Sequence, residues 1–173
     1  MSSGLIHIYC GDGKGKTTAA VGLAVRASGA GKKVLFSQFL KSGLSSEIAV
    51  LQMIDGITIR HCDTERGWVR DMTDSQREQA ACDYDCFLRD LFREAAGFDL
   101  LVLDEVIPAC NHGLVSQDGL VELLERKPEG LEVVITGREP SGALAELADY
   151  VTVMKKIKHP FDRGVMAREG IEF

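Results

Sequence analysis

The sequence has 173 residues, of which 45% are hydrophobic and 27% are charged, a balance typical of one soluble globular domain. A net charge of -6 and a pI near 5.2 argue against nucleic acid as a partner, because proteins that bind it usually carry a basic face. No apolar run reaches the length of a membrane span and the N-terminus lacks a signal-peptide pattern, so we expect a cytoplasmic protein without a membrane partner. The five cysteines show no CxxC pair, which indicates neither a disulfide framework nor a zinc site.

Strands and helices are predicted to alternate along the whole chain. The predicted strands are Leu5–Cys10, Val34–Phe39, Ile57–His61, Asp99–Asp104, Leu131–Thr136 and Tyr150–Met154. The predicted helices are Thr17–Ser28, Thr73–Ala96 with Thr73 or Asp74 as its N-cap, Leu120–Arg126 and Ser141–Ala148. The alternation predicts a single α/β domain over residues 1–173, with an open, mostly parallel sheet and helices on both faces. Ligands of such sheets bind at the carboxyl ends of the strands, where we expect Ser42–Ser46 and Asp63–Asp71 to form mobile loops.

A glycine-rich loop follows the first predicted strand directly and opens the first predicted helix. Its residues are Gly11, Asp12, Gly13, Lys14, Gly15, Lys16, Thr17 and Thr18. A strand, a loop of this kind and a helix that begins at Lys-Thr form a cradle, in which backbone N–H groups and the helix N-terminus bind phosphate. We expect Lys16 to supply a cation and the Thr17 hydroxyl to be a ligand of Mg²⁺. The loop therefore predicts a nucleotide triphosphate site in a P-loop NTPase fold of the RecA-like type.

The spacing within this loop is shorter than the standard pattern. Three residues separate Gly11 from Gly15, where the standard pattern has four before its Gly-Lys-Thr. A shorter loop with an added Lys14 is expected to shift where the phosphates lie.

Two further motifs end predicted strands and so lie at the same edge of the sheet. Asp104 and Glu105 close an apolar strand, where either carboxylate is able to hold Mg²⁺ directly or through water. Arg138 follows the strand that ends at Thr136, and its guanidinium is a candidate for a phosphate contact. An exposed arginine in a glycine turn is the alternative interpretation.

The loop, taken through Ala20, resembles the short P-loop of the ATP:corrinoid adenosyltransferases, which complete the coenzyme form of vitamin B12. Further matches to that family are Gln38-Phe39-Leu40-Lys41, Leu103-Asp104-Glu105, Thr136-Gly137-Arg138, Ile157-Lys158-His159-Pro160-Phe161 and Gly170-Ile171-Glu172-Phe173. They span the whole chain. The set is more specific than any one motif, because a generic P-loop ATPase has no reason to share the C-terminal segments.

This resemblance implies a transferase, in which the Co(I) of a reduced corrinoid attacks the ribose C5′ of ATP and expels inorganic triphosphate. It implies ATP as co-substrate, Mg²⁺ as cofactor, an electron donor such as a reduced flavoprotein, and a homodimer. Lys16, Arg138 and Glu105 are then the catalytic residues, since they and Mg²⁺ stabilise the departing triphosphate. Thr17 would hold the Mg²⁺ together with Glu105 or Asp104.

Trp68 and Phe39 are the corrinoid contacts that the resemblance implies. Trp68 is the only tryptophan and lies in a polar predicted loop, an unusual place for a core residue, although packing under that loop is the alternative. Bulky apolar side chains of this kind exclude an axial ligand from the lower face of Co(II), which eases its reduction. The sequence departs from the family at Arg66, where a second aromatic residue is usual, and at Asp12, where asparagine is usual.

Three functions remain open at this level. An adenosyltransferase is favoured by the whole set of motifs. A P-loop ATPase or kinase would need a residue that orients water or activates an acceptor hydroxyl. A non-catalytic corrinoid-binding or nucleotide-binding relative is the third, and the departures at Asp12 and Arg66 are its basis.

Overall fold

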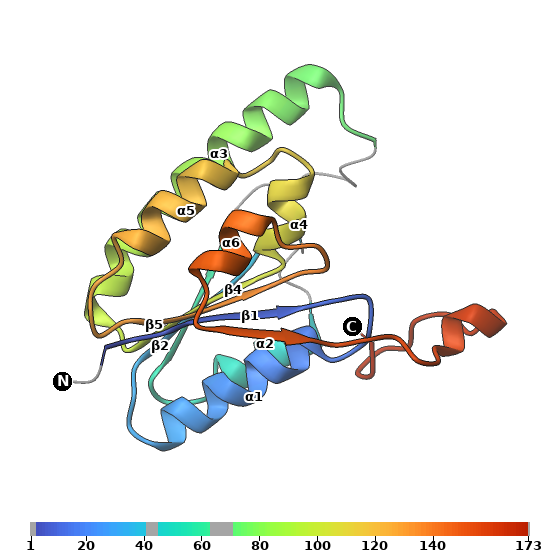
Figure 1. Cartoon of the computed structure of the whole chain (residues 1–173). Helices are drawn as coiled ribbons and strands as arrows, with labels where there is room; N and C mark the ends of the chain where they lie inside the picture. The colour runs from blue at the N-terminus through green and yellow to red at the C-terminus, as the bar shows by residue number, and fades with distance from the viewer. Residues whose placement is uncertain (1–2, 41–44, 63–70, 173) are drawn as a thin grey trace.

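Six parallel strands form one sheet in the computed structural model, which describes residues 3–40, 45–62 and 71–172 (Figure 1). The strand order is β3-β2-β4-β5-β1-β6. The strands are β1 (Ile6–Cys10), β2 (Val34–Gln38), β3 (Ile57–His61), β4 (Leu100–Asp104), β5 (Glu132–Thr136) and β6 (Tyr150–Val153). All neighbouring pairs in it run parallel, so the predicted open parallel sheet is confirmed.

The α-helices of the described residues are α1 (Lys16–Gly29), α2 (Ser46–Leu51), α3 (Asp74–Glu94), α4 (Val106–Asn111), α5 (Gln117–Glu125) and α6 (Gly142–Leu147), with 3-10 helices η2 (Ala95–Gly97) and η3 (Pro160–Arg163). Helices α2 and α4, each of six residues, were not predicted from the sequence. Of the two predicted N-caps of α3, Thr73 and Asp74, the structure has Thr73. Its hydroxyl accepts from the Gln76 backbone N–H, while the Gln76 side chain accepts from the Thr73 N–H.

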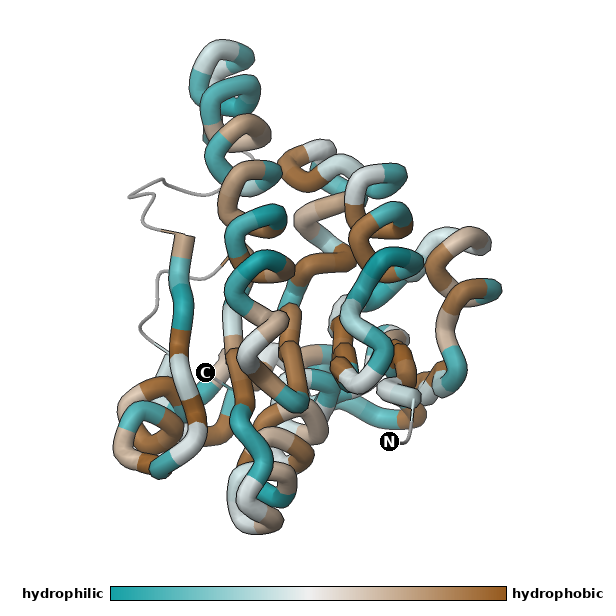
Figure 2. The backbone as a smooth tube through the Cα atoms, turned by 90° about the vertical axis from the view of Figure 1, so that its left-hand side faces the viewer, coloured by the Kyte–Doolittle hydropathy of each residue, from teal (hydrophilic) through white to brown (hydrophobic). Residues whose placement is uncertain are grey.

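Helices cover both faces of the sheet (Figure 1). On one face α1 and α2 pack against alternate residues of the strands, and the contact residues of α1 are small. They are Ala20, Ala24 and Ala27. Helices α3, α4, α5 and α6 cover the other face with larger side chains. Figure 2 shows the hydropathy of each residue, with apolar stretches in the strands and polar residues interspersed along the helices.

The order of the strands decides which segments meet at the carboxyl edge. Strands β1 and β2 are parallel, as predicted, but β5 and β4 lie between them. Helix α1 therefore crosses the sheet and contacts β1, β5, β4 and β2 on its way. The start of α1 consequently lies beside the ends of β4 and β5.

The chain beyond β6 leaves the sheet and then returns to its carboxyl edge (Figure 1). Its return brings Glu172 to Lys14 of the glycine-rich loop. Strand β6 itself is exposed and pairs with β1. Within the described ranges, no helix has both the length and the apolar character that a membrane crossing needs.

Replacing Leu101 by alanine should lower the free energy of unfolding by about 3 kcal/mol, because Leu101 is fully buried in β4 at the middle of the sheet. Urea unfolding followed by circular dichroism measures this loss. Met53→Ala is the matched control, since that side chain is 76% exposed, and it should change stability by less than about 0.5 kcal/mol. Equal losses in both variants would contradict the placement of the core.

Candidate phosphate-binding site

Two segments from outside the glycine-rich loop hold it in place. The backbone N–H of Gly11 donates to the Arg138 carbonyl oxygen at 3.0 Å, and the N–H of Gly13 donates to the Met154 carbonyl oxygen at 2.7 Å. Arg138 follows β5 and Met154 follows β6, and these strands flank β1. The loop is thus anchored from both sides of its own strand, which fixes its shape before a ligand arrives.

Glycine is required in this loop for a reason that the sequence did not reveal. A Cβ on Gly11 would lie 2.5 Å from the Met154 carbonyl oxygen, and one on Gly13 would lie 2.6 Å from it. Gly11 and Gly15 also have φ angles of 104° and 113°, which L-residues with side chains rarely adopt. The chain leaving β6 therefore packs directly on the loop, in addition to any close approach of phosphate.

Lys16 folds back over the loop. Its Nζ donates to the Gly13 carbonyl oxygen at 2.8 Å. Burial lowers the pKa of Lys16, and the carboxylate of Glu105 opposes this shift, while the charge of Arg138 adds to it. The ammonium group is therefore partly removed from water, and the charges of Glu105 and Arg138 both act on it. A phosphate would give it a stronger acceptor than a neutral carbonyl does.

Asp104 connects the loop helix to the neighbouring strands. The Thr17 hydroxyl donates to its Oδ1 at 2.9 Å, and the Thr136 hydroxyl donates to the same oxygen at 2.7 Å. The Gln38 side-chain amide donates to Oδ2 at 3.1 Å. Asp104 is fully buried, so these donors stabilise a charge that would otherwise be costly away from water.

Glu105 takes a different place from Asp104. Its φ of 60° lies in the left-handed region, and its backbone N–H donates to the Thr136 hydroxyl at 2.9 Å. This turn ends β4 and starts α4, and it leaves the Glu105 side chain half-buried with its charge acting on Lys16. The sequence treated the two carboxylates as equivalent, and the structure separates them.

The residues at the carboxyl edge of the sheet suit a hard cation that is bound by the protein and by a ligand together. Thr17 gives its hydroxyl proton to Asp104, so the lone pairs of that oxygen remain for a cation, and Glu105 offers a carboxylate nearby. Oxygen ligands of these types are those that Mg²⁺ takes. Among the described residues no group of three or more His, Cys, Asp or Glu side chains is arranged to hold a metal. A cation here needs further oxygens, as triphosphate would supply.

Arg138 lies beside the loop, and Asp12 lies within it. Arg138 is exposed, and its charge lowers the pKa of both Lys16 and Asp12. The Asp12 carboxylate accepts from the Lys156 backbone N–H at 2.9 Å, and this bond is the largest cause of its lowered pKa. The aspartate at the position where asparagine is usual thus fastens the loop to the C-terminal segment.

The structure describes one of the two expected corrinoid contacts. Phe39 is fully buried and packs against the rings of Tyr84 and Phe87 of α3, so in this structure it is a core residue. Trp68 lies outside the described residues, as does Arg66.

Burial raises the pKa of Cys110 to about 12, which keeps this thiol neutral and makes it a poor metal ligand.

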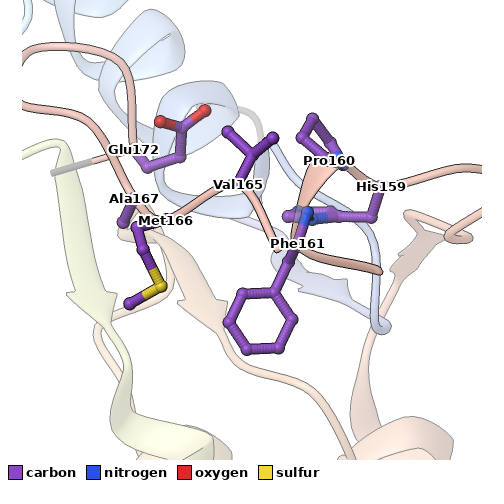
Figure 3. A pocket seen from close by; sticks show the side chains of 7 residues that line it. All are labelled: His159, Pro160, Phe161, Val165, Met166, Ala167 and Glu172. Atoms are coloured by element: carbon purple, nitrogen blue, oxygen red, sulfur yellow. Dashed lines mark hydrogen bonds between the residues drawn. The ribbon is translucent and has the colours of Figure 1, made fainter. Parts of the chain in front are cut away.

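The C-terminal segment closes one side of the site. Lys14 Nζ donates to Glu172 Oε1 at 3.2 Å, and Arg168 binds the same carboxylate through its backbone N–H and its guanidinium. A small hollow beside this carboxylate is lined by His159, Pro160, Phe161, Val165, Met166, Ala167 and Glu172 (Figure 3). The family-like motifs at the C-terminus are therefore brought to the loop by the fold.

Three residues of the site belong to the family-like motifs but were given no role from the sequence. Gln38 and Thr136 each end a strand and contact Asp104, and Glu172 contacts Lys14 across 158 positions of the chain. Their place at strand ends was a usable signal for Gln38 and Thr136. Nothing local in the sequence pairs Glu172 with the loop.

The Glu172 carboxylate should titrate far below its ordinary range. Hydrogen bonds from Arg168 hold the pKa of Glu172 at about 2, against an ordinary 4.5, with Lys14 adding to the shift. Its anchoring is therefore complete above about pH 4.5 and is lost as the pH falls through about 2. The NMR shift of the Arg168 amide proton should titrate with that low midpoint. Glu172→Gln should weaken the contact at neutral pH and Glu169→Gln should leave it unchanged, whereas a midpoint near 4.5 would contradict the assignment.

Comparison with known proteins identifies the family of the chain. The family model described as ATP:corrinoid adenosyltransferase BtuR/CobO/CobP matches residues 2–173. A corrinoid adenosyltransferase of Escherichia coli (strain K12) is 34% identical over 176 residues, which cover 98% of this chain and 86% of that protein. One from Pseudomonas aeruginosa is 33% identical over 171 residues, covering 98% and 84%.

Among solved structures, a KaiC-like protein from Pyrococcus horikoshii OT3 matches 91% of this chain and 75% of its own, with a TM-score of 0.55 and 18% identity. At that identity the likeness concerns the fold alone, and it confirms the predicted P-loop NTPase architecture. The function of the chain is indicated instead by the full-length match and by the curated relatives. The chain belongs to the ATP:corrinoid adenosyltransferase family, a family of transferases that act on corrinoids.

Proposed function

We propose that this protein transfers the 5′-deoxyadenosyl group of ATP to the Co(I) of a reduced corrinoid and releases inorganic triphosphate. The observation that supports this most is the Thr17–Asp104 pair at the glycine-rich loop of a chain that matches the family over its whole length. The loop is then the binding site of the leaving group.

The reaction needs little covalent chemistry from the protein. The electron pair of Co(I) forms the cobalt–carbon bond, the bond between C5′ and its oxygen breaks, and that oxygen leaves with the triphosphate. The corrinoid supplies the nucleophile, so the protein has to position two substrates and stabilise the growing negative charge. The backbone N–H groups of residues 11–18 and the side chains of Lys14 and Lys16 are proposed to bind the phosphates.

Lys16, Arg138 and Glu105 are the proposed catalytic residues. Lys16 would exchange the Gly13 carbonyl for a phosphate oxygen, and Arg138 would add charge from the neighbouring strand end. Mg²⁺, when bound, supplies positive charge that stabilises the triphosphate. Thr17 and Glu105 are proposed to hold it, with Asp104 aligning the Thr17 hydroxyl.

Trp68 and Phe39 remain the proposed corrinoid contacts, and in this structure the Phe39 ring packs against Tyr84 and Phe87. We further propose a cytoplasmic homodimer that receives its electron from a donor such as a reduced flavoprotein. The resemblance of the loop and of the C-terminal motifs to the family supports these assignments.

Incubation with ATP, Mg²⁺ and a chemically reduced corrinoid tests the proposed reaction. The expected result is a light-sensitive cobalt–carbon bond, seen by its absorption spectrum, together with an equal amount of inorganic triphosphate. Hydrolysis to ADP without a corrinoid would instead identify an ATPase. Tight corrinoid binding without a product would identify a non-catalytic relative.

Lys16→Ala should reduce turnover about a hundredfold or more, because it removes a donor that stabilises charge on the leaving group. Initial rates at saturating ATP and reduced corrinoid measure this. Lys32→Ala removes an exposed lysine beyond the end of α1 and is the control, expected to retain the rate of the unaltered protein. A Lys16→Ala rate within a few-fold of that value would refute the assigned role.

A further inference from the structure

Four polar side chains form a row across the carboxyl ends of adjacent strands. They are His61 of β3, Gln38 of β2, Asp104 of β4 and Thr136 of β5, and we call them the polar row. Gln38 is in register with both His61 and Asp104. Side chains alternate along a strand, so the row shares the sheet face on which Phe36 and Val102 pack with α1. The polar row therefore lies on the side where Thr17 starts the loop helix.

Gln38 separates two carboxylates within this region. Its Nε2 donates to Asp104 Oδ2 at 3.1 Å and to Glu47 Oε1 of α2 at 2.9 Å. The opposite orientation of the amide would place its oxygen against both carboxylates, so these contacts define which atom is nitrogen. A neutral double donor thus links two negative groups that would otherwise repel each other.

The oxygen of this amide has no hydrogen-bond partner among the described residues. Gln38 is 2% exposed, and its Oε1 makes no hydrogen bond in the part of the chain that the structure describes. The Nδ1 of His61, its register partner, is also buried and has no hydrogen-bond partner among the described residues. Buried acceptors are nearly always satisfied by protein or by ordered water. Among the described residues the polar row is therefore complete at Asp104 and leaves a buried acceptor at Gln38 that a donor on a ligand could use.

We propose that Gln38 is a positioning residue for the nucleotide-bound cation. Its amide nitrogen holds Asp104 in the orientation that aligns the Thr17 hydroxyl, and its Oε1 accepts a hydrogen bond from a water molecule that binds with the nucleotide and its Mg²⁺. This inference rests on the proposed function for the presence of that cation. It adds a residue on β2 that acts on the cation through Asp104 and through water.

The chemistry of the cation favours water as the missing donor. Mg²⁺ gives up its hydration shell reluctantly and usually keeps several water molecules, whose hydrogens need acceptors. Groups that hydrogen-bond the ligands of a metal commonly change its affinity by tenfold to a hundredfold when they are replaced. Gln38 meets this description, since it contacts Asp104, and Asp104 contacts the proposed ligand Thr17.

The test measures how much Mg²⁺ strengthens nucleotide binding. The full chain is titrated by calorimetry with the β,γ-imido analogue of ATP, once in Mg²⁺ and once in EDTA. The dissociation constant in EDTA divided by the dissociation constant in Mg²⁺ is the gain due to the cation. Gln38→Leu should reduce this gain at least about tenfold, while affinity in EDTA changes less than about threefold. Gln38→Asn keeps the amide but is too short to reach both carboxylates, and it serves if the leucine variant does not fold.

Ser37→Ala is the matched control. Ser37 is the neighbouring buried residue of β2, and its hydroxyl donates to the Val102 carbonyl at 3.0 Å on the opposite face of the strand from Gln38. Its loss should lower the melting temperature and leave the gain from Mg²⁺ intact. A gain that persists in the Gln38 variants, or one that Ser37→Ala reduces equally, would overturn the positioning role. If the unaltered protein gains nothing from Mg²⁺, the cation site of the proposed function fails as well.

Discussion

The buried carboxylate of Asp104 is the interaction on which the rest of the site depends. It accepts hydrogen bonds from Thr17 at the start of α1, Thr136 at the end of β5 and Gln38 at the end of β2. A buried charge is tolerated only when such donors compensate for lost water, so its position and theirs are determined together. The Asp104 carboxylate thereby connects three strands and the loop helix at the carboxyl edge of the sheet.

The glycine-rich loop owes its shape to contacts from outside itself. The carbonyl oxygens of Arg138 and Met154 receive two of its N–H groups, and Lys16 rests on the loop's own Gly13 carbonyl. The C-terminal segment adds Glu172 on Lys14 and the Lys156 N–H on Asp12. A site built in this way is largely formed before the nucleotide binds, which reduces the ordering cost of binding.

Fold and activity are supported by different observations in this protein. The KaiC-like structure shares the arrangement of strands and helices at 18% identity, and such a likeness says nothing of the reaction. Membership of the adenosyltransferase family comes from the match over residues 2–173. The proposed reaction is compatible with both the fold and the family, since a phosphate-binding loop can hold a departing triphosphate as well as it can hold a substrate for hydrolysis.

The sequence by itself determined the local features: the strands, the long helices, two adjacent candidates for the N-cap of α3 and the glycine-rich loop. These depend on periodicity, capping and backbone freedom, which act over a few residues. Only the tertiary structure decided the roles that depend on strand order. It placed β5 between β1 and β4, gave Asp104 and Glu105 different surroundings, buried Phe39, and brought Gln38 and Glu172 to the site. Contacts between distant segments follow from packing of the whole sheet, and no short stretch of the chain encodes them.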